Sequence, residues 1–188
     1  MLPEQIKNFR VLVNLKDGVT VLLRPMIQED EARLVELFAP TSEEDLRYIR
    51  DKVKDPSVIK GWCEGLDYSK VLPLLAMVKD RVVGLSTLHF RSGPRRHLGE
   101  VRIFLVKDFR RRGLGSKMIN TLIELARRQD LHILVAEIVA DQTKVIKSFQ
   151  NLGFVLRSTF EDYFMLPDGD LRDVAFLMYC LRPKMDEF

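Results

Sequence analysis

The chain has 188 residues, of which 46% are hydrophobic and 30% are charged, and its formal net charge is +3. This length suits one domain with one sizeable core, and the composition excludes a disordered or fibrous chain. The weak net charge argues against a dedicated nucleic-acid-binding protein, and the longest apolar runs are too short to cross a membrane. The N-terminus has no signal-peptide pattern, so we expect a cytoplasmic protein.

The cysteines and histidines give no sign of a metal centre. Cys63 and Cys180 form no CxxC pair, and His89, His97 and His132 lack the spacing of metal ligands. We therefore expect neither a disulfide scaffold nor a bound metal.

The chain alternates between strand-like and helix-like segments. Residues 9–15 and 19–24 are β-rich, and Lys16-Asp17-Gly18 between them predicts a hairpin turn. Helices are expected at 31–38, from 41 onward, and at 57–65, 115–129 and 143–151. Further strands are expected at 71–78, 82–90, 100–106, 132–139, 154–164 and 174–181. This order predicts an α+β fold with a mostly antiparallel sheet: a hairpin arm at 1–18, the main domain at 19–181 and a tail at 182–188.

One segment, from Val106 to Met118, carries the clearest chemical signal. A strand runs into the basic loop Arg110-Arg111-Arg112-Gly113, and a helix follows. The N-terminus of a helix has unpaired N–H groups and a partial positive charge, and glycines at 113 and 115 let a bulky anion approach the backbone. The arginines add charge-assisted donors. The segment therefore predicts a phosphate-binding loop, the alternative being a solvated basic turn that caps the helix.

The spacing of the glycines excludes two common phosphate motifs. A dinucleotide-binding fingerprint needs Gly or Ala at position 118, where this chain has Met118. A P-loop needs Lys directly after its last glycine, but Gly115 is followed by Ser116. The pattern R/Q-x-x-G-x-G/A does fit, with Arg110 in first place and Gly113 and Gly115 after it. In this the chain resembles the GNAT superfamily of N-acetyltransferases.

A second motif lies about 30 residues further on. The superfamily has a helix of the form N-x-x-A-x-x-x-Y followed by Gly-Phe, and here Gln142, Val145 and Phe149 stand at the three helix positions before Gly153-Phe154. The two motifs occur in the expected order, with a helix and a strand between them. The opening Leu23-Arg24-Pro25 with Asp30 is similar to the protein-lysine acetyltransferase branch.

The resemblance implies a single GNAT-type domain, a twisted and mostly antiparallel sheet of about seven strands flanked by helices. It implies direct transfer of an acetyl group from acetyl-CoA to a primary amine, on a protein lysine or a small molecule, in a ternary complex. It leaves the oligomeric state open, a homodimer being one option. The residues it assigns to acetyl-CoA are Phe104, Leu105, Val106, Arg110, Arg111, Arg112, Gly113, Leu114, Gly115, Ser116, Gln142 and Phe149.

The reaction needs a base for the ammonium and a proton source for the leaving thiolate. Glu100 is the candidate base because the lysine-acetyltransferase branch has a Glu at this place on the strand; the alternative is a solvated Glu at a strand end. Many relatives use the Tyr of the second motif as acid, but Phe149 has no hydroxyl, which leaves Tyr163, Tyr179, Ser148 or solvent. The substitutions at 142 and 149 also fit a catalytically weak acyl-CoA-binding sensor.

Overall fold

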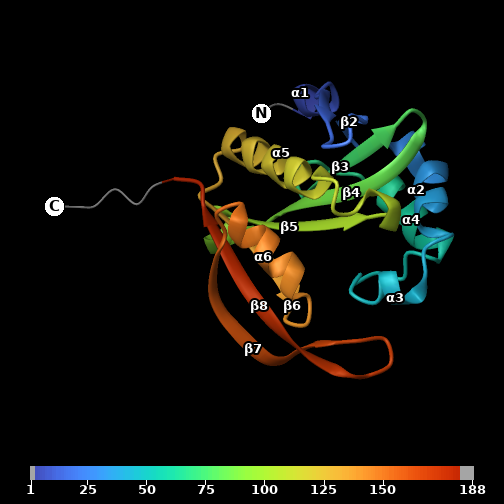
Figure 1. Ribbon diagram of the computed structural model, residues 1–188. Helices are drawn as coiled ribbons and strands as arrows, with labels where there is room; N and C mark the ends of the chain where they lie inside the picture. Colours follow the sequence, from blue (N-terminus) through green and yellow to red (C-terminus); the bar gives the residue numbers. More distant parts are fainter. Residues whose placement is uncertain (1–2, 183–188) are drawn as a thin grey trace.

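The structure is a computed structural model that describes residues 3–182, and it contains one eight-stranded sheet in the order β1-β2-β3-β4-β5-β6-β8-β7 (Figure 1). The strands are β1 (Val11–Asn14), β2 (Thr20–Pro25), β3 (Val71–Val78), β4 (Arg81–Phe90), β5 (Leu98–Leu105), β6 (Ile133–Val139), β7 (Val155–Met165) and β8 (Leu171–Cys180). The helices are α1 (Pro3–Lys7), α2 (Glu31–Phe38), α3 (Glu43–Leu46), α4 (Pro56–Glu64), α5 (Leu114–Arg128) and α6 (Thr143–Asn151).

This architecture confirms the predicted α+β class. The sheet has one strand more than the expected seven or so, because β1 pairs antiparallel with β2 through four residues and so extends the sheet. The hairpin between them forms where expected: Gly18 takes φ +84, and the Leu15 N–H donates to the Val19 carbonyl at 2.8 Å. Of the predicted tail, only Arg182 lies within the described residues.

Helices cover both faces of the sheet. On one face, Phe38 of α2 packs against Phe104 of β5 and against Trp62 of α4, with ring centroids 5.2 and 6.2 Å apart. The other face carries α5, whose side chains Met118, Ile119 and others are buried against the sheet, and α6 (Figure 1). This burial of an apolar helix stripe is the main stabilising contribution to such a fold. Within the described residues, no helix is long and apolar enough to cross a membrane.

A buried ion pair holds the end of β2. Arg24 donates two hydrogen bonds to the carboxylate of Asp30, at 2.6 and 2.5 Å, and the Ile27 N–H donates to the same carboxylate at 2.9 Å. Asp30 is fully buried. Burial alone would raise the pKa of Asp30, but the bonds from Arg24 and Ile27 outweigh it and lower that pKa. The Arg-Pro…Asp opening therefore serves to fix the start of α2.

The strands β5 and β6 separate halfway along the sheet. They pair in parallel only between Leu98–Glu100 and Ile133–Val135, whereas the other neighbouring strands pair antiparallel. Beyond Glu100, β5 continues to Leu105 alongside β4, and β6 continues to Val139 alongside β8. A parallel pair that stops after three residues leaves two strand segments with free inner edges. The cleft opens between them.

Candidate active site

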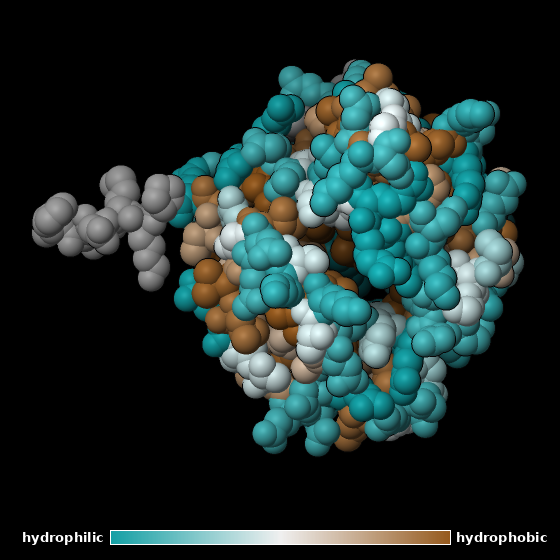
Figure 2. Space-filling model, in the orientation of Figure 1, coloured by the Kyte–Doolittle hydropathy of each residue, from teal (hydrophilic) through white to brown (hydrophobic). Residues whose placement is uncertain are grey.

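The cleft between β5 and β6 has a volume of about 1470 Å³. Its walls include the β5 segment Ile103–Leu105, the loop before α5, the exposed side of α6 and the segment around Tyr48. The space-filling view shows a hollow near the middle of the molecule, bordered largely by hydrophilic residues (Figure 2). A volume of this size is enough for a large cofactor together with a second substrate.

The loop at one end of the cleft has the backbone of an anion site. After a short 3-10 turn at Lys107–Phe109, Arg111 takes φ +59 and Gly113 takes φ +87, and α5 begins at Leu114. Gly113 stands at the N-cap and has no side chain with which to cap the helix. The first-turn N–H groups of α5 are thus left to donate hydrogen bonds to an outside anion. A positive φ at a non-glycine residue such as Arg111 is a strained conformation that is common at functional sites.

Gly115 lies in that first turn, beside the cleft. A Cβ built on Gly115 would lie 3.4 Å from Leu105 and 3.7 Å from Ile103, both of which line the cleft. These are ordinary contact distances, so the protein itself would tolerate a methyl group there. Internal packing therefore does not require a glycine at this position, which borders the cleft.

The three arginines of the loop have different roles. Arg111 is exposed and lines the cleft. Arg110 also lines it, but its guanidinium donates to the Leu105 carbonyl at 3.0 Å and to Asp45 of α3 at 2.5 Å. Arg112 turns toward the β1–β2 hairpin, where its Nε donates to the carboxylate of Asp17 at 2.5 Å. Arg112 is not one of the described residues that line the cleft. The side chain of Arg112 therefore does not reach the predicted site, although its backbone N–H remains in the loop.

Helix α6 forms the wall opposite the loop. Its N-cap residue Gln142 and its residues Lys144, Ser148 and Phe149 line the cleft. Phe149 is 4% exposed and packs edge-on against Phe154, with centroids 5.0 Å apart. The second motif thus reaches the same cleft as the first, as the resemblance implies. Among the predicted contact residues, the side chain of Leu114 is fully buried in the core, so only its backbone can serve the site.

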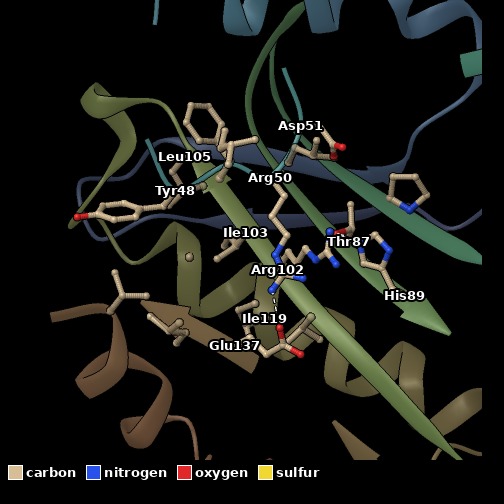
Figure 3. Close-up of a pocket in the computed structure, with 18 of the residues that line it drawn as sticks. Tyr48, Arg50, Asp51, Thr87, His89, Arg102, Ile103, Leu105, Ile119 and Glu137 are labelled. Atoms are coloured by element: carbon tan, nitrogen blue, oxygen red, sulfur yellow. Dashed lines mark hydrogen bonds and ion pairs between the residues drawn. The ribbon is translucent and has the colours of Figure 1, made fainter. Parts of the chain in front are cut away.

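A charged cluster occupies the end of the cleft near Glu100. Glu100 accepts hydrogen bonds from Arg91 at 2.5 Å and from Arg102 at 2.7 Å, and Arg50 lies 3.2 Å away. Arg50 also donates to Glu137 of β6 at 2.7 Å (Figure 3). Arg50 therefore links a carboxylate on β5 to a carboxylate on β6. The Glu100 carboxylate is only 1% exposed and among the described residues it does not line the cleft.

The surroundings of this cluster shift two pKa values. Burial would raise the pKa of Glu100, but the hydrogen bond from Arg102 and the charges of Arg102, Arg50 and Arg91 outweigh it and lower that pKa. Glu100 is therefore ionised at neutral pH. His89, which lines the cleft beside Thr87, has its pKa lowered to about 4, first by burial and then by the charge of Arg102. Its imidazole is neutral at pH 7 and contributes no charge.

The candidate acids fall into two groups. Tyr163 lines the cleft, is 57% exposed and packs against Phe160 and Phe176 beside a bulge of β7. Ser148 also lines the cleft. Tyr179 does not: its ring packs on Phe154, and its hydroxyl accepts a hydrogen bond from Arg127 on α5.

Sequence reasoning missed several cleft residues. Tyr48 and Arg50 belong to an irregular segment that has no recognisable pattern, and Thr87 and His89 lie on β4, one strand away from the motif. Glu137 did give a signal, because it is the one charged residue in the otherwise apolar strand Ile133–Val139. A carboxylate in such a strand needs a partner, and here the partner is Arg50.

Comparison with known proteins agrees with this geometry. The GNAT domain of S. lividans PAT is 20% identical, with a TM-score of 0.78 over 96% of this chain and 99% of that one. A ribosomal-protein-alanine N-acetyltransferase from Brucella melitensis is 24% identical, with a TM-score of 0.73 over 84% and 98%. Salmonella typhimurium yncA, solved with its cofactor acetyl-CoA, is 22% identical, with a TM-score of 0.73 over 88% and 96%. Residues 32–154 match the acetyltransferase (GNAT) family, and the chain therefore belongs to that family.

Proposed function

We propose that the protein transfers an acetyl group from acetyl-CoA to a primary amine, in a ternary complex without a covalent enzyme intermediate. The observation that carries the proposal is the cleft itself. It joins an uncapped helix N-terminus at one end to a cluster of charged side chains at the other, along a strand with a free inner edge.

The residues present fit acetyl-CoA. The N–H groups of residues 111–116 would hold the pyrophosphate, with Arg111 as the guanidinium that faces the cleft. The backbone of Phe104 and Leu105 would contact the pantetheine arm, and Gln142 and Phe149 would form the facing wall. Among the described residues, the predicted contact residue Val106 is outside the cleft lining: it is buried, its N–H donates to the Val83 carbonyl, and its carbonyl accepts from the Phe109 N–H. Acetyl-CoA supplies the acyl group as a reactive thioester. Arg110 acts differently, because its bonds to Leu105 and Asp45 brace the loop against α3.

The amine must lose a proton before it attacks. We propose Glu100 as the base; because its carboxylate is buried under guanidinium groups, it would act through a water molecule. Glu137 is the other carboxylate of the cluster and reaches the cleft surface directly. The variants Glu100→Gln and Glu137→Gln distinguish the two roles.

The leaving thiolate must gain a proton or depart without one. Tyr163 stays the proposed donor as a phenol on the cleft wall, and Tyr48 is a second phenol that lines the cleft. Phe149 supplies ring packing at the position of the usual tyrosine but no proton. A donor that is 57% exposed competes with water, so solvent protonation is the alternative that the Tyr163→Phe variant tests.

The second candidate function is a catalytically weak acyl-CoA sensor, which the absence of a hydroxyl at Phe149 favours. One assay separates the two. The protein is mixed with acetyl-CoA and a panel of amines and peptides, including lysine peptides and peptides with an N-terminal alanine, and release of the CoA thiol is followed. Thiol release that depends on the acceptor supports the transferase. Binding of acetyl-CoA by calorimetry, without release for any acceptor, supports the sensor.

A further inference from the structure

The charged cluster at the acceptor end of the cleft is built with its positive groups outward. The side chains of Arg50, Arg91 and Arg102 are 33%, 41% and 35% exposed, whereas those of Glu100 and Glu137 are 1% and 13% exposed. Three guanidinium groups thus lie over two carboxylates. A ligand that enters from the cleft meets the guanidinium side of the cluster first.

The arginines retain hydrogen-bonding capacity after they have paired with the protein. Within residues 3–182, Arg91 donates to Glu100 through Nη2, and Arg102 donates through Nε. A guanidinium has five N–H donors in a planar fork that matches a carboxylate. The remaining donors of these two side chains are therefore available to an anionic group of a ligand.

The three arginines come from separate parts of the chain. Arg91 follows β4, Arg102 lies on β5, and Arg50 follows α3 and reaches toward Glu137 on β6 (Figure 3). Against the carboxylates of Glu100 and Glu137, the three guanidinium groups leave one positive charge in excess. Asp51, exposed at the rim of the same end, also lines the cleft and offers a position for a cation. His89 is neutral at pH 7 and adds no charge to the cluster.

We propose that these arginines select an acceptor that carries a carboxylate close to its amine. The proposal rests on the proposed acetyl transfer and names the class of acceptor: an amine whose carboxylate binds Arg91 and Arg102 while the nitrogen faces the thioester. Without that carboxylate, the remaining N–H donors of Arg91 and Arg102 would find no charged partner on the acceptor. The carboxylate can belong to a small amino acid or to an acidic residue beside a lysine in a peptide.

The test uses matched pairs that differ only in charge. The small pair is 4-aminobutyrate and 4-aminobutanamide, and the peptide pair is a capped Glu-Lys-Glu tripeptide and its Gln-Lys-Gln counterpart. Because charge-assisted bonds are the strong ones, the carboxylate member of at least one pair should have kcat/KM about 10- to 100-fold higher. The pair that shows the difference identifies the source of the carboxylate.

The variants connect this preference to the cluster. Arg91→Gln should reduce the ratio within the pair to near unity, and Arg91→Lys should restore it in part. Arg95→Gln is the matched control, because Arg95 is exposed on the neighbouring 3-10 turn and outside the cleft lining. Melting temperatures of all variants report whether a loss of preference is only a loss of folding. Equal kcat/KM within both pairs, or an unchanged ratio in Arg91→Gln, would overturn the proposal.

Failure of acetyl transfer itself would look different. In that case no member of either pair releases thiol, although calorimetry detects acetyl-CoA binding. The carboxylate proposal is then decided by calorimetry of 4-aminobutyrate and the Glu-Lys-Glu peptide against the acetyl-CoA-loaded protein. Binding that Arg91→Gln abolishes and Arg95→Gln retains supports the proposal, and no binding, or binding that both variants retain, contradicts it.

Discussion

Substitution of Gly115 should change stability and cofactor binding in opposite directions. Gly115 lies in the first turn of α5, and its added Cβ meets Leu105 and Ile103 at 3.4 and 3.7 Å, so the first atom of a side chain is accommodated without a clash. An Asp in the first turn of a helix is stabilising by about 0.3–1 kcal/mol, and replacing Gly inside a helix adds several tenths more. Gly115→Asp should therefore raise the melting temperature of the free protein.

The same Asp should weaken acetyl-CoA binding. It places a negative charge beside the expected pyrophosphate, where a unit repulsion at about 4–5 Å amounts to roughly 1 kcal/mol in bulk water and roughly 3–4 kcal/mol near a protein surface. The isosteric Gly115→Asn shares the bulk but not the charge, so calorimetry should find the Asp variant about 10- to 100-fold weaker than the Asn variant. High salt should reduce the difference. Equal affinities for the two folded variants would refute the placement of the phosphates.

The remaining predictions concern catalysis and the buried ion pair. Glu100→Gln should lower kcat by about 10²–10⁴ with acetyl-CoA affinity unchanged; such a loss in Glu137→Gln alone would assign the base to Glu137. Phe149→Tyr adds a hydroxyl of pKa ~10 and should raise the turnover rate by up to ~10², whereas a fall with folding intact would show that the site needs an apolar wall. Asp30→Asn should cost about 3–5 kcal/mol of unfolding free energy at pH 7 by breaking its bonds to Arg24. Because the pKa of Asp30 is lowered in the folded state, calorimetry should find this difference present above about pH 4 and lost as the pH falls further.

Local rules predict most of the elements that build the site. The strand at 71–78 and the helix at 143–151 have the same bounds in the structure as in the sequence prediction, and α5 differs by one residue at each end. Periodicity and turn residues fix such elements over short range. The helix expected from residue 41 onward is only one turn, Glu43–Leu46, which is capped by Ser42. A helix this short is marginal by its own propensity, and the long-range bond between Asp45 and Arg110 ties it to the loop before α5.

Contacts between distant segments explain what the sequence analysis missed. The guanidinium cluster around Glu100 joins segments that carry Arg50, Arg91 and Arg102, and only Arg102 is close enough in sequence, on the same strand face, to be anticipated. Likewise, three consecutive arginines look equivalent as a motif, yet the side chain of Arg112 pairs with Asp17 of a hairpin nearly a hundred residues earlier. Tertiary pairing of this kind leaves no periodic signal.

The measurement that tests the central claim most directly is a single-turnover reaction of the 188-residue chain with acetyl-CoA and the acceptors named above. Free CoA thiol and acetylated acceptor are both quantified, and the protein's own mass is recorded. Direct transfer predicts one thiol released per acetylated amine, no acetyl group on the protein, and no thiol release without acceptor. Tight acetyl-CoA binding with no thiol release for any acceptor, or an acetylated protein formed before the acceptor is added, would contradict it.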